Sequence, residues 1–296
     1  MEDKKRLIII DSNALLHRSF HALPPLTNKL GEQTGAIYGF LLILFKAIKD
    51  LNANYIVACF DLPQPTFRHK KFEQYKAQRP KTPDGIVSQI PTAKDILGSF
   101  KIPVFAKEGY EADDLIATIA TKAEKDSEVY ILSGDLDNLQ LVNERIKVYT
   151  LGRGIKDTVI YDTEKVISRF GVTPKQIIDF KSLSGDPADN ISGVPGIGKK
   201  TASELIQKFG SVENLYGEIK QGMANIRPRI RDLLITHKKM AFLSLELVEM
   251  KKDVDIEFSL ENCKFGKFNL KEVEEKFKQL DFNTLINRLP TFSNNQ

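Results

Sequence analysis

Short apolar runs alternate with longer helical patterns through the first half of the 296-residue chain, and this alternation most constrains its fold. The runs that are typical of buried strands lie at residues 7–10, 55–60, 103–105 and 129–132. The stretches in which apolar residues recur every three to four positions, as in helices, lie at residues 35–51, 84–100 and 113–125. Strands that alternate with helices indicate βαβ units. We therefore expect an α/β fold with a twisted, mostly parallel sheet and helices on both faces.

The second half of the chain has a different pattern. Two β-like runs at 146–151 and 158–161 flank Gly152 and Gly154, which predicts a hairpin at the edge of the sheet. Beyond them, the segments with helical patterns lie at residues 163–170, 174–183, 201–209 and 226–245. We predict three parts: an α/β domain at 1–170, a mostly helical region at 171–290 and a flexible tail at 291–296.

Acidic side chains stand where the predicted strands end and where the 113–125 helix begins. They are Asp11, Asp61, Glu111, Asp113, Asp114, Asp135 and Asp137. Because the carboxyl ends of parallel strands meet at one edge of a sheet, we expect these acids to converge on one cleft. So many negative charges repel one another unless cations bind, and a donor set made only of oxygen favours Mg²⁺ or Mn²⁺ over zinc. The alternative is that these acids cap helices and lie in solvated loops, with Asp113 as an ordinary N-cap.

A second acidic pair, Asp186 and Asp189, lies in the sequence Gly-Asp-Pro-Ala-Asp-Asn, beyond the predicted sheet. By itself this sequence is typical of a turn. The pair becomes a candidate for metal binding only if the chain folds back over the acidic cleft.

Cysteine content, charge and hydrophobic run length exclude several classes of protein. Cys59 and Cys263 are the only cysteines, which excludes a disulfide framework and a Cys-based zinc site and favours a reducing, cytoplasmic setting. The net charge of +4 is too small to indicate nucleic-acid binding by itself. The longest apolar run, 35–45, is too short to span a bilayer, and the charged N-terminal stretch 1–6 is followed by only four apolar residues before Asp11. We therefore expect neither a membrane segment nor a signal peptide.

The segment 62–84 is basic, aromatic and rich in proline. Its six cations, against the single acid Glu73 before residue 84, are Arg68, Lys70, Lys71, Lys76, Arg79 and Lys81. Phe67, Phe72 and Tyr75 stand among them. A basic insertion with aromatic residues beside a carboxylate cleft suits a phosphate backbone and stacked bases. The alternative is a solvated basic helix whose aliphatic stems cover the core.

The sequence from Gly193 to Ala202 is similar to a Walker A loop but departs from it. Lys200 stands where Ser or Thr would have to reach Mg²⁺, and no buried strand precedes the loop. We therefore favour a helix–hairpin–helix over 191–209, in which Ile191 closes a short helix and 201–209 forms the next one. Backbone N–H groups at the start of that second helix can bind phosphate without reading sequence, and Lys199 and Lys200 add positive charge.

Taken together, these motifs resemble the 5′-nuclease (flap endonuclease) family, and most closely the 5′→3′ exonuclease domain of bacterial DNA polymerase I and its stand-alone homologues. The motifs are Ile-Asp-Ser-Asn at 10–13, Phe-Asp at 60–61, Thr-Phe-Arg-His at 66–69, Tyr-Lys-Ala-Gln-Arg at 75–79, Gly-Tyr-Glu-Ala-Asp-Asp at 109–114, Gly-Asp-Leu-Asp at 134–137, Gly-Asp-Pro-Ala-Asp-Asn at 185–190 and Gly-Val-Pro-Gly-Ile-Gly at 193–198. All nine acidic positions of the family's metal cluster are acidic here, since Asp186 and Asp189 join the seven acids at the strand ends.

The resemblance implies a PIN-like sheet and hydrolysis of DNA at 5′ ends, nicks and flaps, giving a 5′-phosphate and a 3′-hydroxyl, in replication and repair. Two Mg²⁺ or Mn²⁺ ions would bind the nine acids. Lys76 and Arg79 would stand on a helical arch, residues 62–84, and neutralise charge on the phosphate. The residues that would contact DNA are Arg68, Lys70, Lys71, Tyr75, Lys81, Gly193, Gly196, Gly198, Lys199, Lys200 and Thr201.

The resemblance also carries expectations about partners. The 191–209 hairpin would be a helix–two-turn–helix that grips duplex DNA, where K⁺ can bridge backbone carbonyls to phosphate. We expect a monomer that acts on flapped, nicked or branched DNA, with an RNA primer as a further candidate substrate. It would be linked to a DNA polymerase or work with one. The open alternatives are a PIN-type ribonuclease, a catalytically inactive DNA-binding module and a P-loop NTPase.

Overall fold

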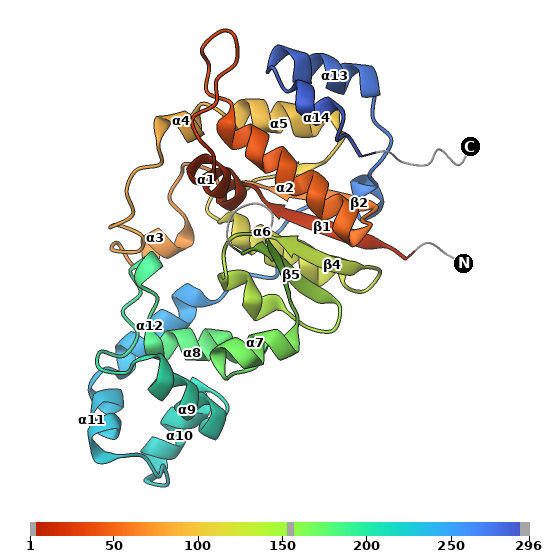
Figure 1. Ribbon diagram of the computed structural model, residues 1–296. Helices are drawn as coiled ribbons and strands as arrows, with labels where there is room; N and C mark the ends of the chain where they lie inside the picture. Colours follow the sequence, from red (N-terminus) through yellow and green to blue (C-terminus); the bar gives the residue numbers. More distant parts are fainter. Residues whose placement is uncertain (1–3, 153–156, 291–296) are drawn as a thin grey trace.

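A six-stranded sheet forms the centre of the computed structural model, which describes residues 4–152 and 157–290 (Figure 1). The strands are β1 (Arg6–Asp11), β2 (Tyr55–Cys59), β3 (Val104–Phe105), β4 (Glu128–Leu132), β5 (Ile146–Leu151) and β6 (Thr158–Tyr161). Their order in the sheet is β3-β2-β1-β4-β5-β6. All neighbouring pairs are parallel except β5 and β6, which form the expected antiparallel hairpin at the edge. Gly154, within the predicted turn, lies outside the described residues.

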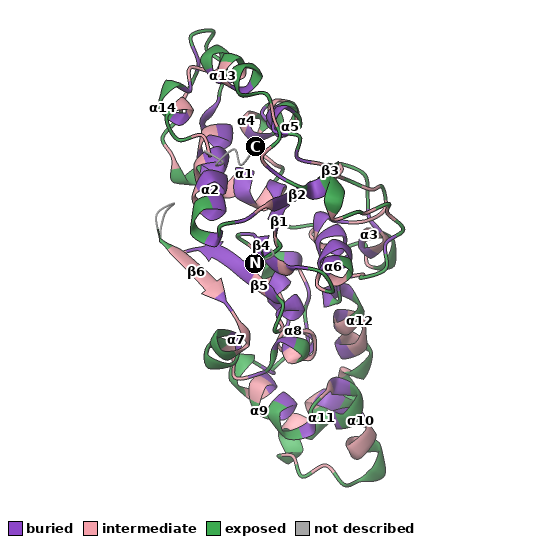
Figure 2. Cartoon of the chain, turned by 90° about the vertical axis from the view of Figure 1, so that its right-hand side faces the viewer, coloured by how far each residue is buried: buried purple, intermediate pink, exposed green. Residues whose placement is uncertain are grey.

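Alternate side chains of β1 enter two separate cores, one on each face of the sheet. Leu7 and Ile9 pack on the face covered by α6 (Ala112–Ala123), whereas Ile8 and Ile10 pack on the other face. That second face is covered by α1 (Ser12–Ala22), α2 (Gly35–Leu51), α5 (Ile90–Ser99), α13 (Leu270–Gln279) and α14 (Asn283–Ile286). Figure 2 shows the central strands as buried and β6 as only partly buried. The sheet is therefore covered by helices on both faces, as the sequence predicts.

A helical region extends from the sheet at the lower end of Figure 1. It consists of α7 (Thr163–Phe170), α8 (Ile177–Ser184), α9 (Lys199–Phe209), α10 (Val212–Gln221), α11 (Pro228–Thr236) and α12 (Lys238–Val248). Its apolar side chains continue the core on the α6 face. After α12 the chain returns to the sheet, where Lys264 forms a β-bridge with Tyr55 before α13 and α14. Among the described residues, no helix is long and apolar enough to cross a membrane.

Two predicted helices are divided in the structure, and four α-helices are additional. The 84–100 pattern forms α4 (Asp84–Val87) and α5, because Pro91 lacks the N–H that a continuous helix would need. The 226–245 pattern is interrupted at His237 between α11 and α12. The sequence analysis did not predict α1, α10, α13 and α14.

Candidate active site

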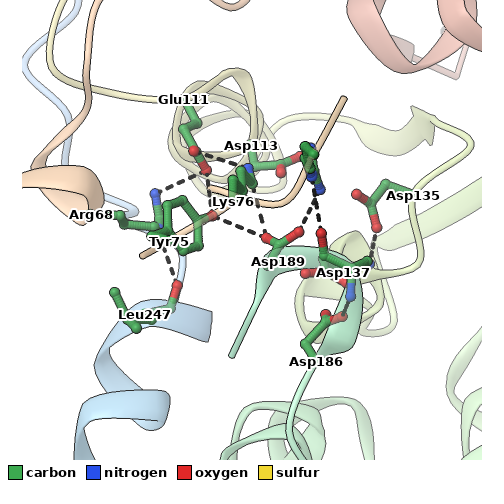
Figure 3. A network of polar contacts seen from close by, with 12 residues as sticks. Arg68, Tyr75, Lys76, Glu111, Asp113, Asp135, Asp137, Asp186, Asp189 and Leu247 are labelled. Atoms are coloured by element: carbon green, nitrogen blue, oxygen red, sulfur yellow. Dashed lines mark hydrogen bonds and ion pairs between the residues drawn. The ribbon is translucent and has the colours of Figure 1, made fainter. Parts of the chain in front are cut away.

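The sheet brings the predicted acids together at its carboxyl edge (Figure 3). Asp11 is the last residue of β1, Asp61 follows β2, and Asp135 follows β4. Glu111 caps the N-terminus of α6, and Asp113 lies in the first turn of that helix. Four of these acids line a cavity of about 780 Å³ that Lys76 and Arg79 also line. The predicted convergence on one cleft is therefore confirmed for the acids Asp11, Asp61, Asp113 and Asp135.

Asp11 is held in one orientation at the bottom of this cleft. Its Oδ1 accepts a hydrogen bond from the backbone N–H of Ala14, 3.2 Å away, so Asp11 is the N-cap of α1. Its Oδ2 accepts from the Oγ of Ser133 at 2.5 Å. Burial raises the pKa of Asp11 to about 6, and the nearby charge of Asp61 adds to this rise. Ser133 is a residue that the sequence analysis missed, although its place directly after β4 was a usable signal.

The carboxylates of the cleft repel one another. Burial raises the pKa of Asp113 well above its usual range, and the charges of Asp11 and Asp135 raise it further. Burial, together with the charge of Asp135, raises the pKa of Asp137 to about 7. Such a group of buried acids gains from a bound cation, because a positive charge would offset both burial and mutual repulsion. A donor set made only of carboxylate oxygens fits a hard divalent cation such as Mg²⁺ or Mn²⁺.

Asp186 and Asp189 lie beside the acidic cleft, because the chain folds back over it. The sequence analysis made this the condition for their being metal ligands. Asp186 caps the short helix η3 (Pro187–Asp189) that carries Asp189. Lys181 of α8 donates to Asp137 and lies 2.7 Å from the Oδ2 of Asp186. Burial lowers the pKa of Lys181, but the charges of Asp137 and Asp186 outweigh burial, and the net effect raises it. The sequence analysis did not identify Lys181. This residue lies on α8, five positions before Asp186 in the sequence.

Lys76 and Arg79 reach the cleft from the arch. The Nζ of Lys76 lies 2.9 Å from Oε1 of Glu111 and 3.7 Å from Oδ2 of Asp189. Arg79 forms an ion pair with Asp189, and its Nε donates to the backbone carbonyl of Ala188 at 3.1 Å. Burial raises the pKa of Asp189, but the charges of Lys76 and Arg79 outweigh burial and hold this pKa below its usual range. Both basic residues therefore lie at the cleft, as the resemblance implies, although they stand in turns and not in a helix.

The arch is helical only over α3 (Phe67–Lys71). The following residues form turns that rest on the η3 loop, where Lys76 N–H donates to the carbonyl of Asp189 at 3.0 Å. The side-chain amide of Asn190 donates to the carbonyl of Gln74 at 2.7 Å. Lys76 itself has a φ of 55°, in the left-handed region. Its strained backbone is thus supported by the loop that carries Asp189.

Two residues that we expected to contact DNA are buried instead. Arg68 is 2% exposed and Tyr75 is 3% exposed. The hydroxyl of Tyr75 lies 3.1 Å from Oε2 of Glu111 and 3.0 Å from Oδ2 of Asp189. Arg68 donates to both carboxylate oxygens of Asp114, each at 2.8 Å. The expected DNA contact is therefore wrong for both residues in this structure: they lie behind the carboxylates, away from solvent.

Asp114 also departs from its predicted role as a metal ligand. It is completely buried, and besides Arg68 its oxygens accept from the backbone N–H groups of Glu111 and Lys251, at 3.1 Å and 2.9 Å. These bonds occupy the acceptor positions that a metal ion would need. Eight acids remain as candidate ligands. Within residues 4–152 and 157–290, no three His, Cys, Asp or Glu side chains are arranged around one point as ligands, and Lys76, Arg79 and Lys181 lie between the carboxylates.

The predicted hairpin follows α8 and leads into α9. Gly193 and Gly196 have φ values of +62° and +87°, and a Cβ on Gly193 would lie 2.2 Å from the backbone nitrogen of Gly185. Glycine is thus required there by both conformation and space. Ile191 closes no helix; it forms a β-bridge with Asp186, which corrects the prediction. The residues at the start of α9, with Gly198 as the N-cap, are Lys199, Lys200 and Thr201, of which the two lysines are exposed.

The remaining predicted DNA contacts lie on the outer surface of the arch. Lys70, Lys71 and Lys81 are all exposed. Lys71 forms an ion pair with Glu246 of α12, and Lys81 lies 4.0 Å from Asp84. None of the three lines the cavity that holds the acids. Their contact with DNA stays a prediction.

Comparison with known protein families gives two adjoining matches. Residues 6–171 match the family described as 5'-3' exonuclease, N-terminal resolvase-like domain. Residues 172–271 match the family described as 5'-3' exonuclease, C-terminal SAM fold. The first match contains the sheet, the arch and seven of the nine acids, and the second contains Asp186, Asp189 and the hairpin.

Individual relatives agree with these matches. The chain is 41% identical over 290 residues to DNA polymerase I of Bacillus subtilis, covering 98% of this chain and 33% of that protein. It is also 41% identical over 283 residues to a 5'-3' exonuclease of Aquifex aeolicus, covering 95% of this chain and 94% of that protein. The chain thus spans about a third of the length of the polymerase.

Solved structures share the fold at low sequence identity. A complex of the bacteriophage T5 flap endonuclease with DNA and metal ions aligns with a TM-score of 0.68 and 22% identity, over 82% of this chain and 89% of that chain. The catalytic core of Rad2 in complex with DNA substrate aligns with a TM-score of 0.63 and 19% identity, over 98% and 93%. These likenesses support the sheet and the helical region described above.

Proposed function

The chain belongs to the 5'-3' exonuclease family, and we propose that it hydrolyses DNA phosphodiesters at 5′ ends, nicks and flaps in replication and repair. The products would be a 5′-phosphate and a 3′-hydroxyl. The observation that carries this proposal is the cleft at the carboxyl edge of the sheet, where Asp11, Asp61, Asp113 and Asp135 face Lys76 and Arg79. The T5 and Rad2 complexes with DNA support it at the level of the fold.

We propose that the cleft holds two divalent cations, Mg²⁺ or Mn²⁺. Asp11, Asp61, Glu111 and Asp113 would hold one ion, and Asp135, Asp137, Asp186 and Asp189 would hold the other. When bound, such ions supply a nucleophilic hydroxide and stabilise the negative charge of the leaving oxygen. The raised pKa values of Asp11, Asp113 and Asp137 support this assignment, because a group of repelling acids is where a cation gains most. A T5 protein of the same fold was co-crystallised with metal ions, which supports cation binding in general.

The basic residues of the arch would act on the phosphate itself. Lys76 and Arg79 are paired with Glu111 and Asp189 in this structure. Once cations neutralise those acids, the two basic side chains are free to donate to the oxygens of the scissile phosphate, where negative charge grows during the reaction. They would also orient the phosphate, since both reach the cleft from the arch, whereas the acids come from the strand ends, α6 and the η3 loop.

The hairpin would hold the duplex beside the cleft. The exposed side chains of Lys199 and Lys200 and the free N–H groups at the start of α9 suit phosphate oxygens. A cavity of about 580 Å³ is lined by Lys181 and Asp186 on one side and by Lys199 and Lys200 of α9 on the other. Backbone carbonyls of the hairpin could additionally bind K⁺. The chain would act as a monomer. Its similarity to DNA polymerase I supports the proposal that it is linked to a DNA polymerase or acts together with one.

The competing functions are less well supported. The family matches favour a 5′ nuclease over a PIN-type ribonuclease. All nine acids are present, as an active enzyme requires, and no strand leads into the 193–198 loop as a P-loop NTPase would need.

The proposal is tested with a 5′-labelled flap and a nicked duplex, each incubated with Mg²⁺ and with EDTA. We expect cleavage only with the cation, and product lengths separate stepwise trimming from incision at the flap base. Full cleavage in EDTA would contradict the role of the acids.

A further inference from the structure

A buried network joins the arch, the start of α6 and the segment after α12. Arg68, at the base of the arch, donates through Nε to the carbonyl of Leu247 and through Nη2 to the carbonyl of Glu249, both at 2.8 Å. Its Nη1 and Nη2 also bind the two oxygens of Asp114. Lys251 N–H donates to Oδ1 of Asp114 at 2.9 Å. The guanidinium and the carboxylate therefore connect three segments that lie far apart in the sequence.

This network ends at Glu111, a candidate metal ligand. Asp114 Oδ2 accepts from the backbone N–H of Glu111 at 3.1 Å, which fixes the main chain at the start of α6. Nη1 of Arg68 lies 3.4 Å from Oε2 of Glu111, which Tyr75 also approaches (Figure 3). Oε1 of Glu111 is thereby left to pair with Lys76, which lines the cleft. Asp114 thus fixes the backbone of Glu111, and Arg68 fixes its side chain.

We propose that Arg68 and Asp114 are positioning residues for the nuclease reaction: they set the orientation of Glu111, and Asp114 does not itself bind metal. This inference rests on the proposed function, because it assigns Glu111 to a divalent cation. A role in stability alone accounts poorly for the pair. A buried ion pair is often no more stabilising than apolar side chains of the same volume. Here both members of the pair also bond Glu111, Arg68 through the side chain and Asp114 through the backbone N–H.

The first test counts metal ions. Free Mn²⁺ is measured by electron paramagnetic resonance during titration of wild type, Asp113→Asn and Asp114→Asn. We expect Asp114→Asn to bind as many ions per chain as wild type and Asp113→Asn to bind one fewer. Loss of an ion in Asp114→Asn would make it a ligand and overturn the proposal. If wild type itself bound no Mn²⁺ and cleaved no DNA, the proposed function would fail instead.

The second test separates positioning from stability. Residues that orient a metal ligand change activity by about 10–100-fold when they are altered, so we expect this loss in the single-turnover rate of Asp114→Asn at saturating DNA and Mg²⁺. The control is Thr118→Val, since the Thr118 hydroxyl bonds the carbonyl of Asp114 at 2.8 Å and Val254 N–H at 3.2 Å but does not touch Glu111. This variant should lose a similar amount of thermal stability and keep its rate within a few-fold of wild type.

Equal rate losses in the two variants at equal loss of stability would show that the network is structural only. If Asp114→Asn does not fold, Arg68→Lys replaces it. Lysine keeps a positive charge opposite Asp114 but cannot donate to Leu247, Glu249 and Asp114 together. The same 10–100-fold loss is then expected with an unchanged number of bound ions. An unchanged rate would overturn the proposal.

Discussion

The Nζ of Lys76 lies 2.9 Å from Oε1 of Glu111, so that a cation of the arch pairs directly with the acid that caps α6. Burial lowers the pKa of Lys76, but the charges of Glu111 and Asp189 outweigh burial and raise it, so Lys76 stays protonated through the physiological range. The arch thus supplies a permanent positive charge at the mouth of the acidic cleft.

Removal of that charge should affect chemistry more than binding. In Lys76→Ala we expect the single-turnover rate to fall roughly 10²–10³-fold, as for the loss of one electrostatic stabiliser, while the Kd for DNA in Ca²⁺ changes little. Lys70→Ala is the control, because Lys70 is exposed on α3 outside the cavity and should affect mainly affinity. A Lys76→Ala enzyme that binds weakly but keeps its saturating rate would limit the arch to holding DNA.

Lys181 should compete with metal in the protein without DNA. In Lys181→Met, Asp137 and Asp186 lose their shared counter-ion, so the Tm in EDTA should fall by several degrees. Mg²⁺ should then raise the Tm more in this variant than in wild type, because the cation replaces the missing ammonium. Lys175→Met, at an exposed position, is the control. Equal Mg²⁺ effects in all three proteins would mean that Lys181 does not occupy a metal position.

The raised pKa values of the acids give a pH dependence with a defined sign. Asp11 and Asp137 have pKa values of about 6 and about 7, against about 3.9 for an unfolded Asp. The metal-free folded chain therefore binds more protons than the unfolded chain between about pH 4 and 7, and its stability should fall as pH rises through that range.

Chemical denaturation in EDTA at pH 5.5 and pH 8 measures this effect. We expect the lower midpoint at pH 8, and saturating Mg²⁺ should remove the difference or reverse it, since the cation binds the deprotonated acids. A higher midpoint at pH 8 in EDTA would contradict the raised pKa values.

The hairpin should bind phosphate without reading sequence. Each phosphate contact contributes about 0.9 to the slope of log K against log salt, so Lys199→Ala with Lys200→Ala should reduce that slope by roughly 2. The loss of affinity should be the same for duplexes of unrelated sequence, which fluorescence anisotropy at several salt concentrations would measure. A loss confined to particular sequences would indicate base readout.

The sequence predicts the sheet and most of the cleft because both follow from local patterns. Four apolar runs mark the strands β1 to β4. An acid that follows such a strand must lie at the carboxyl edge of the sheet, so the positions of Asp11 and Asp61 follow from topology alone. The burial of individual side chains, in contrast, does not follow from local patterns. In the sequence, Arg68 is one of the six cations of segment 62–84. Only the tertiary fold directs its side chain inward to Asp114.

Because side-chain contacts depend on the tertiary fold, the sequence analysis also misassigned Asp114 and missed Lys181 and Ser133. Asp113 and Asp114 are adjacent on α6, yet one lines the cavity and the other points away from it, since neighbours on a helix lie about 100° apart. Lys181 and Ser133 have ordinary local sequence, and their roles arise from contacts with Asp137 and Asp11 across the fold. The division of α4 from α5, in contrast, could have been predicted from Pro91.

The central claim is that the acids at the strand ends perform metal-dependent cleavage of DNA, and Asp135→Asn tests it most directly. Asp135 lines the cavity, and its Oδ1 accepts a bond from the backbone N–H of Asp137 at 2.9 Å, which Asn can preserve. The measurement is the single-turnover cleavage of a 5′ flap in Mg²⁺ at saturating enzyme, with the Kd for the same DNA in Ca²⁺. We predict a rate lower by orders of magnitude with affinity kept or improved, because a ligand and a negative charge are lost together. A rate near that of wild type would contradict the account.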